Sequence, residues 1–148
     1  MSENLPRIAL GTDHAGYTYK EYLKAQLETC GHPVQDFGTY SEEPVDYPLP
    51  VKAAARAVAA GDCDLGIVLG GSGNGEAMAA NKIAGIRCAL CWDENTGRLA
   101  KEHNNANILS LGQRQITKEM AWKIVQAWLH AEFEGGRHER RIDLIETA

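Results

Sequence analysis

Short apolar runs alternate along the chain with longer segments in which apolar residues recur at helical spacing. The runs that predict strands are Arg7–Leu10, Val34–Phe37, Leu65–Leu69, Ile86–Cys91 and Ile108–Leu111. The segments that predict helices cover residues 17–30, 47–60, 76–83, 95–103 and 117–133. Parallel strands need crossover helices that lie across the faces of their sheet. The alternation therefore predicts a doubly wound α/β fold, with five parallel strands covered by helices on both faces.

The first break in this alternation is Gly135-Gly136, which ends the last long helix and is followed by a short charged segment, 137–146. No linker or low-complexity segment divides the chain earlier. A length of 148 residues corresponds to about one domain. We therefore expect a single domain over residues 1–148 that ends in a basic segment, 135–146.

Composition excludes several classes of protein. Hydrophobic residues make up 44% and charged residues 24% of the chain, as in globular proteins. No apolar run approaches the roughly 20 residues that span a bilayer, and acidic Glu3 stands where a signal peptide carries positive charge. A net charge of -5 disfavours nucleic acid as a partner. We expect a cytoplasmic protein without a membrane or nucleic-acid partner, in which any anion site is local.

The four cysteines, Cys30, Cys63, Cys88 and Cys91, do not resemble the disulfide framework of a small secreted protein. Cys88 and Cys91 form a C-x-x-C pair, but an offset of three residues in a strand puts their side chains on opposite faces. We therefore favour reduced core thiols over a redox or zinc role.

Polar and small residues follow three of the predicted strands. In a doubly wound sheet, ligands bind outside the carboxyl ends of the strands. Residues 11–16, which include Asp13 and His14, follow the first strand; residues 70–76 follow the third; and Gly112 to Arg114 follow the fifth. We expect these three turns to form one candidate site.

The segment Gly70-Gly71-Ser72-Gly73-Asn74-Gly75-Glu76 is rich in glycine and opens directly into a helix. Its backbone N–H groups and the helix N-terminus suit a phosphate or a developing oxyanion. It has neither the G-x-G-x-x-G spacing nor the Gly-Lys-Ser/Thr of nucleotide sites, so we expect no nucleotide cofactor. The alternative is a tight turn that uses glycine only for its dihedral freedom.

Glu76 stands where the helix is expected to begin. A carboxylate there is consistent with simple capping, because the helix dipole stabilises it. Beside Ser72 and a cluster of amides, it can also abstract a carbon-bound proton while the amides hold the resulting enediolate. Asp13 is consistent with a cap or with an acid or base that acts on a sugar hydroxyl. His14 is consistent with a turn residue or with a phosphate ligand. Tyr47, taken alone, is as consistent with a buried aromatic residue as with a residue of the site.

Arg137, His138 and Arg141 give an acidic protein a basic tail. In a helix Arg137 and Arg141 share a face, and with Arg114 they form a credible phosphate clamp; the alternative is a solvated tail. His103 and Asn104 end the fourth helix, at the edge opposite the strand carboxyl ends. They are either ordinary helix-terminal residues or residues that enter the site of a neighbouring subunit.

Several of these segments together resemble the type B ribose-5-phosphate isomerase family, which includes galactose-6-phosphate isomerases. The resemblance covers nearly the whole chain. Its landmarks are Gly11–Gly16, Asp46-Tyr47-Pro48, Gly70–Glu76, Ala79–Lys82, His103-Asn104-Asn105 and Gly135–Arg141. It implies a Rossmann-like three-layer α/β/α fold and a homodimer with sites shared between subunits. It leaves open whether two dimers pair into a tetramer. It also implies interconversion of aldose and ketose phosphates without a cofactor or metal.

The resemblance also implies roles for residues. Many members carry a catalytic cysteine where this chain has Gly70, and another branch uses a glutamate at the position of Glu76. Glu76 is then the base, and Asp13 and His103 are implicated in opening the sugar ring. The enediolate is held by Ser72, Asn104 and the amides of Gly71, Gly73, Asn74 and Gly75. Tyr47 lines the sugar site, and the phosphate is held by His14, Arg114, Arg137 and Arg141, with His138 close by.

The first expectation is isomerisation of ribose 5-phosphate to ribulose 5-phosphate. A second hypothesis keeps the chemistry but changes the substrate to allose 6-phosphate, galactose 6-phosphate or a tetrose phosphate. A third is a non-catalytic module that binds a sugar phosphate.

Overall fold

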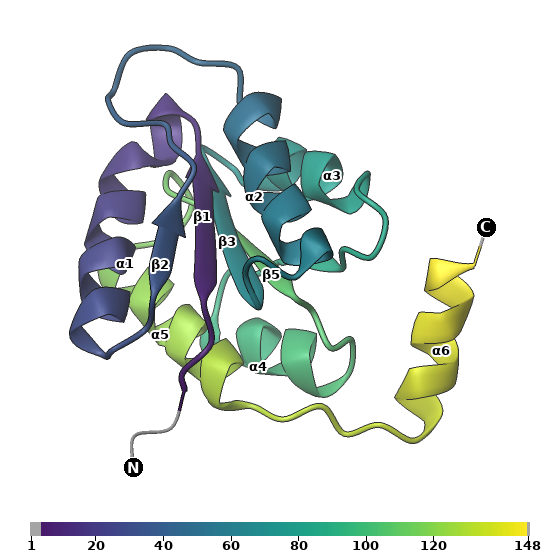
Figure 1. The fold of residues 1–148 in the computed structure, drawn as a ribbon. Helices are drawn as coiled ribbons and strands as arrows, with labels where there is room; N and C mark the ends of the chain where they lie inside the picture. Colours follow the sequence, from purple (N-terminus) through teal and green to yellow (C-terminus); the bar gives the residue numbers. More distant parts are fainter. Residues whose placement is uncertain (1–3, 148) are drawn as a thin grey trace.

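The computed structural model describes residues 4–147, so Glu3 lies outside the described residues. All five strands pair in parallel in one sheet, in the order β2-β1-β3-β5-β4. The strands are β1 (Ile8–Thr12), β2 (Val34–Asp36), β3 (Leu65–Gly70), β4 (Cys88–Leu90) and β5 (Ile108–Gly112). The predicted parallel sheet is therefore confirmed (Figure 1).

The helices begin at residues that favour helix starts. Asp93 and Thr117 accept backbone N–H bonds as caps of the fourth and fifth helices, and Pro48 stands in the first turn of the second. A 3₁₀ turn, η1 (His14–Gly16), precedes the first helix. The helices are α1 (Tyr17–Thr29), α2 (Pro48–Ala60), α3 (Asn74–Asn81), α4 (Glu94–Glu102), α5 (Lys118–His130) and α6 (Arg137–Glu146). Among the helices of residues 4–147, none combines the length and apolar character that a membrane crossing requires.

Two hydrophobic cores lie on the two faces of the sheet. Side chains alternate between the faces of a strand, and in β1 Ile8 and Leu10 join one core while Ala9 joins the other. The first core is closed by α1, α4 and α5, and the second by α2 and α3. This arrangement is the three-layer α/β/α fold, with helices on both sides of the sheet (Figure 1).

The strand order puts the carboxyl ends of β1, β3 and β5 next to one another. Thr12 pairs with Leu69, and Gly70 pairs with Gly112. The chain winds from β1 to β2 through α1 on one face and returns to β3 through α2 on the other, so the ends of β1 and β3 flank a topological switch point, where ligands bind in such sheets. The turns after these three strands therefore meet at one edge, as the sequence predicts.

The two cysteines of the C-x-x-C pair lie in different cores. Cys91 is buried in the first core, and Cys88 packs against the second. Burial raises the pKa of both thiols, that of Cys91 to about 11. The prediction that the two side chains lie on opposite faces of the strand is confirmed, and this separation disfavours a metal shared by the two thiols.

The charged C-terminal segment forms a helix, α6, which stands apart from the layers of the sheet at the end of an extended linker (Figure 1). Arg87 connects it to the rest of the molecule: its Nη1 lies 2.6 Å from Glu146 Oε1, and its Nη2 donates to the carbonyl oxygen of Asn105 at 2.9 Å. Leu144 and Ile145 of α6 are exposed. The helix thus presents apolar as well as basic side chains to solvent.

Candidate active site

The glycine-rich segment is held against the end of β5 through its carbonyl groups. Gly70 and Gly71 accept hydrogen bonds from the N–H groups of Gln113 (2.8 Å) and Arg114 (3.0 Å). The carbonyl of Gly73 accepts a bond of 2.7 Å from the buried Ser110 hydroxyl. Within residues 4–147, the N–H groups of Gly71 and Ser72 have no hydrogen-bond partner. With its carbonyls engaged, the segment can offer N–H donors to a bound anion.

Two glycines of this segment are required because functional side chains take up the space of a Cβ atom. A Cβ on Gly70 would lie 2.5 Å from Glu76 Oε1, and the rest of the carboxylate is closer still. A Cβ on Gly75 would lie 2.5 Å from the hydroxyl oxygen of Tyr47. Gly73 adopts the left-handed φ of 84° that begins α3. Dihedral freedom therefore explains Gly73, whereas close approach of Glu76 and Tyr47 explains Gly70 and Gly75.

Glu76 is a buried carboxyl group, only 4% exposed, in the first turn of α3. Burial raises its pKa, and the nearby negative charge of Asp13 adds to this effect. Hydrogen bonds from the backbone N–H groups of Gly73 and Glu76 itself act in the opposite direction on the same pKa but do not reverse the shift. A carboxyl group with a raised pKa suits reversible proton transfer near neutral pH better than an exposed capping residue does.

Asp13 and His14 are fixed by the turn that follows β1. Asp13 Oδ1 accepts bonds from the N–H groups of Ala15 (2.9 Å) and Gly16 (3.2 Å), which is the capping role that the sequence left open. His14 Nδ1 accepts a bond of 3.1 Å from the N–H of Val45. Because that N–H can only donate, a neutral His14 ring carries its proton on Nε2, where it can be donated to a ligand oxygen.

The remaining predicted residues of this edge contact the same segment. Arg114 Nη1 would lie 3.0 Å from a Cβ on Gly71, so the guanidinium covers that glycine. The hydroxyl oxygen of Ser72 accepts a bond of 3.2 Å from the N–H of Asn74. The predicted residues that meet at the carboxyl edge are Asp13, His14, Tyr47, Gly71, Ser72, Gly73, Asn74, Gly75, Glu76 and Arg114.

The other predicted residues gather at the opposite edge, around the end of α4 and the start of α6. His103 is the C-cap residue of α4, and its ring stacks on that of His138, with ring centroids 4.3 Å apart. The carbonyl of Asn104 accepts a bond from Arg87 Nε at 3.2 Å. Burial and the positive charge of Arg137 lower the pKa of His138. The predicted placement of His103 and Asn104 away from the strand carboxyl ends is confirmed.

The three arginines of the predicted clamp do not come together within a single chain. Arg137 and Arg141 belong to α6, whereas Arg114 lies at the carboxyl edge beside Gly71. The linker after α5 carries α6 toward the end of α4, where the Glu134 N–H donates to the carbonyl of Glu102 at 3.0 Å. The three arginines therefore form two separate groups within one protomer.

Sequence reasoning missed two residues of the second group, Glu134 and Arg87. The carboxylate of Glu134 lies 3.4 Å from His138 Nε2 and 3.8 Å from His103 Nε2. No signal pointed to Glu134, because Gly135-Gly136 breaks the helical spacing between it and His138. Arg87 lies within the predicted strand Ile86–Cys91 but just before the observed β4, and no sequence pattern indicates that its side chain reaches α6.

Residues 8–145 match the ribose/galactose isomerase family. The chain is 43% identical over 141 residues to ribose-5-phosphate isomerase B of Escherichia coli K12, with 95% of each chain covered. It superposes on ribose-5-phosphate isomerase B of Clostridium thermocellum with a TM-score of 0.94, at 46% identity and 95% coverage of each chain.

A further similar structure is that of ribose-5-phosphate isomerase B from Mycoplasma genitalium with bound ribulose-5-phosphate. Its TM-score is 0.90 at 43% identity, and the match covers 95% of this chain and 93% of that one. The family match and these identities extend over both groups of candidate residues. The chain therefore belongs to the ribose/galactose isomerase family.

Proposed function

We propose that the protein interconverts ribose 5-phosphate and ribulose 5-phosphate, with Glu76 as the base. The observation that carries this proposal is the buried Glu76 carboxylate, placed against the segment whose free N–H groups suit an oxyanion. The names of the relatives, and the ribulose-5-phosphate bound to the Mycoplasma genitalium protein, support the choice of substrate.

The chemistry needs one base that works on two neighbouring carbons. Glu76 removes the proton from C2 of the open-chain aldose, and the electron pair forms the C1–C2 double bond as charge moves to the carbonyl oxygen. The N–H groups of Gly71 and Ser72 stabilise that charge in the cis-enediolate. Glu76 then returns the proton to C1, the C2 hydroxyl passes its proton to the oxygen on C1, and the C2 carbonyl forms, which gives the ketose.

The shape of the site favours a glutamate base over a cysteine base. The Glu76 carboxylate fills the space in which a side chain at position 70 would begin. A thiol at that position and the observed Glu76 conformation exclude each other. This supports assignment of the chain to the branch that uses glutamate.

Phosphate and ring-opening roles are divided between the two groups of residues. At the carboxyl edge, His14 Nε2 and the Arg114 guanidinium are the donors for a phosphate. Within residues 4–147, Asp13 Oδ2 accepts no hydrogen bond, which leaves it free to receive a proton from a sugar hydroxyl. The second group, which comprises His103, Asn104 and the α6 arginines, lies at the opposite edge of the sheet and so does not serve the site of its own protomer.

We infer a homodimer in which each site takes its second group from the other subunit. The separation of the two groups supports this, because each chain then holds two half-sites. Exposed apolar side chains, Met78 and Trp92 near edge strand β4 and Leu144 and Ile145 on α6, offer surface that a second copy can cover. The four free cysteines fit a reducing compartment, in keeping with a cytoplasmic location.

Proton NMR of the purified protein with ribose 5-phosphate in deuterated water tests the proposal. We expect ribulose 5-phosphate to appear with deuterium at the carbon that receives the proton, because an exchangeable carboxyl group carries it. Absence of ketose from a folded, dimeric sample would overturn the substrate assignment. Turnover of allose 6-phosphate, galactose 6-phosphate or a tetrose phosphate in its place would identify a different sugar with the same chemistry.

A further inference from the structure

Three side chains with metal-binding atoms meet between the end of α4 and the start of α6: His103, Glu134 and His138. One donor atom from each can be chosen so that all three lie within 4.8 Å of one another. This cluster was not expected from the sequence, and the proposed isomerase mechanism leaves Glu134 without a role.

The backbone around the cluster is anchored at three points. His103 caps α4 through a bond of 2.9 Å from its N–H to the carbonyl of Leu99. The Glu134 N–H donates to the carbonyl of Glu102 at 3.0 Å, and the His138 N–H donates to that of Gly135 at 3.2 Å. The three side chains therefore project from positions that are already held together, so an ion would not have to assemble them from separate segments.

The distance between Glu134 and His138 fits a tetrahedral ion, and the distance between Glu134 and His103 is a few tenths of an ångström longer. Two ligands that bind Zn²⁺ at about 2.0–2.2 Å with tetrahedral angles lie about 3.3–3.5 Å apart. Glu134 Oε1 lies 3.4 Å from His138 Nε2 and 3.8 Å from His103 Nε2. The two rings are stacked with an angle of 14° between their planes, so one must turn for both nitrogens to point at a single ion. The His103 side chain is 37% exposed and has room to turn.

A buried nitrogen without a partner points independently to a ligand. The His138 side chain is only 7% exposed, and its Nε2 has no hydrogen-bond partner among residues 4–147. Glu134 Oε1 lies 3.4 Å away but forms no hydrogen bond with this nitrogen. Buried polar atoms in folded proteins are nearly always satisfied, so an exception calls for an explanation such as a bound ion.

We propose that His103, Glu134 and His138 form a site for a borderline divalent cation such as Zn²⁺, with water completing the coordination. Two imidazole nitrogens and one carboxylate are a donor set that Zn²⁺ and Co²⁺ accept readily. The bound ion would occupy His103 and His138 and tie the start of α6 to α4. A consequence that rests on the proposed function is that the ion inhibits the isomerase, because the lone pair of His103 is no longer available.

Direct metal binding is the first test, on the full-length untagged protein in the Cys30→Ser background, which removes the exposed thiol. Titration calorimetry with Zn²⁺ should give one ion per chain with a Kd on the order of micromolar or tighter. Co²⁺ should give the visible absorption bands of a tetrahedral ion with nitrogen and oxygen ligands. Absence of saturable binding at about 100 μM Zn²⁺ would overturn the proposal, since that would be a hundred times the expected Kd.

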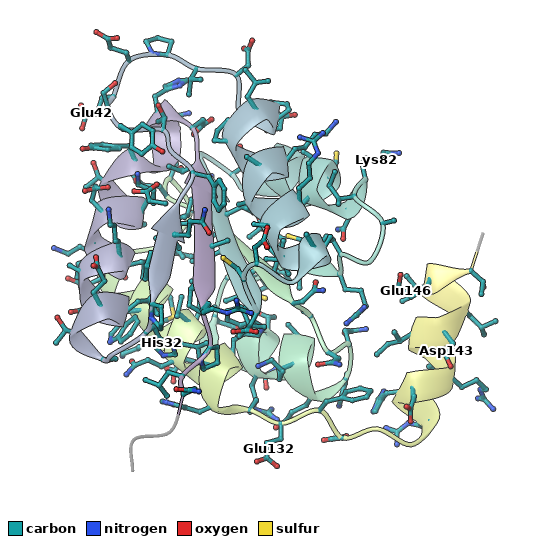
Figure 2. All side chains as sticks on the ribbon, in the orientation of Figure 1. His32, Glu42, Lys82, Glu132, Asp143 and Glu146 are labelled. Atoms are coloured by element: carbon teal, nitrogen blue, oxygen red, sulfur yellow. The ribbon has the colours of Figure 1, made fainter. Side chains whose placement is uncertain are left out.

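Glu134→Gln removes the carboxylate charge from an exposed residue with no proposed part in the isomerase reaction. We expect its Kd for Zn²⁺ to rise about tenfold or more, as when a metal site loses a supporting group. The matched control is Glu132→Gln, an exposed glutamate of the same linker that Figure 2 shows pointing away from the rest of the chain. Equal affinity in Glu134→Gln and in the unmodified protein would also overturn the site.

Isomerase assays with and without Zn²⁺ separate the site from its consequence. We expect Zn²⁺ to inhibit the unmodified protein reversibly, with recovery on adding EDTA. In Glu134→Gln we expect the ratio of the rates with and without Zn²⁺ to stay near one. If calorimetry shows the ion but no sugar phosphate turns over, the proposed function fails and the metal site stands. If turnover is normal with the ion bound, the inhibitory consequence is wrong.

Discussion

Substitution of Gly70 by alanine tests whether the position of the Glu76 carboxylate controls the reaction. The added Cβ would start 2.5 Å from Oε1 and closer to the rest of the carboxylate, whereas Cβ contacts in proteins do not fall below 3.0 Å. The group must therefore withdraw by about 1 Å, and a misplacement of that size costs about a hundredfold in rate. Because the phosphate ligands are untouched, we expect kcat for ribose 5-phosphate to fall by about this factor while KM changes little.

The assay is steady-state turnover of ribose 5-phosphate, with a thermal melt of each variant. Gly66→Ala, in the same strand, is the matched control, because its Cβ would meet Ile108 and Val58 side chains at 3.2 Å, well away from the site. The control should keep its kcat even if both variants lose stability. An unchanged kcat in folded Gly70→Ala would refute the reasoning that the carboxylate must stay in its observed place.

Four further predictions concern the proposed roles. Glu76→Gln should lower turnover at least about a hundredfold. In the unmodified protein, kcat should fall as the pH is lowered, with a midpoint above the ordinary glutamate pKa of 4.5, because the pKa of Glu76 is raised. A midpoint at or below that value would contradict the assignment of Glu76 as the base. Because the folded-state pKa of Glu76 is raised, stability falls as pH rises from the unfolded pKa through the folded one. Glu76→Gln should therefore melt at a higher temperature than the unmodified protein at pH 7.5, and this gain should vanish below pH 4.5. Arg137→Ala should raise KM for ribose 5-phosphate by about tenfold or more, as expected for loss of a charged hydrogen bond, and an unchanged KM would remove it from the clamp. Mixed dimers of Glu76→Gln and His103→Ala subunits should recover activity that neither variant has alone, and verified heterodimers without activity would exclude the shared site.

The sheet and the first half-site could be predicted because local sequence determines both. Apolar runs that end in glycine give the strands and their ends, and parallel topology then brings the turns at Asp13 and Gly70 to one edge. The predicted start of α3 was two residues late, since a left-handed Gly73 lets the helix begin at Asn74. The direction of the Glu76 pKa shift could not be predicted from the sequence, because burial raises this pKa and the hydrogen bonds at the helix end lower it.

The second group could be predicted only in part. The helix end at His103 placed that residue on the opposite edge, but the course of the linker after α5 depends on contacts between distant segments. The Glu134 bond to the carbonyl of Glu102 and the Arg87 bonds around α6 are such contacts. The spacing of residues in the sequence does not indicate such contacts. For this reason the sequence did not predict that Arg114 lies apart from the α6 arginines, or that Glu134 approaches His138.

The overlap between position 70 and the Glu76 carboxylate also bears on how the two kinds of base could replace each other during evolution. A chain that gains the glutamate while it keeps a side chain at position 70 has two groups competing for one space. A chain that first reduces position 70 to glycine has no base at all until the glutamate arrives. Both single-step routes pass through an impaired enzyme, so Gly70 and Glu76 should be inherited as a pair.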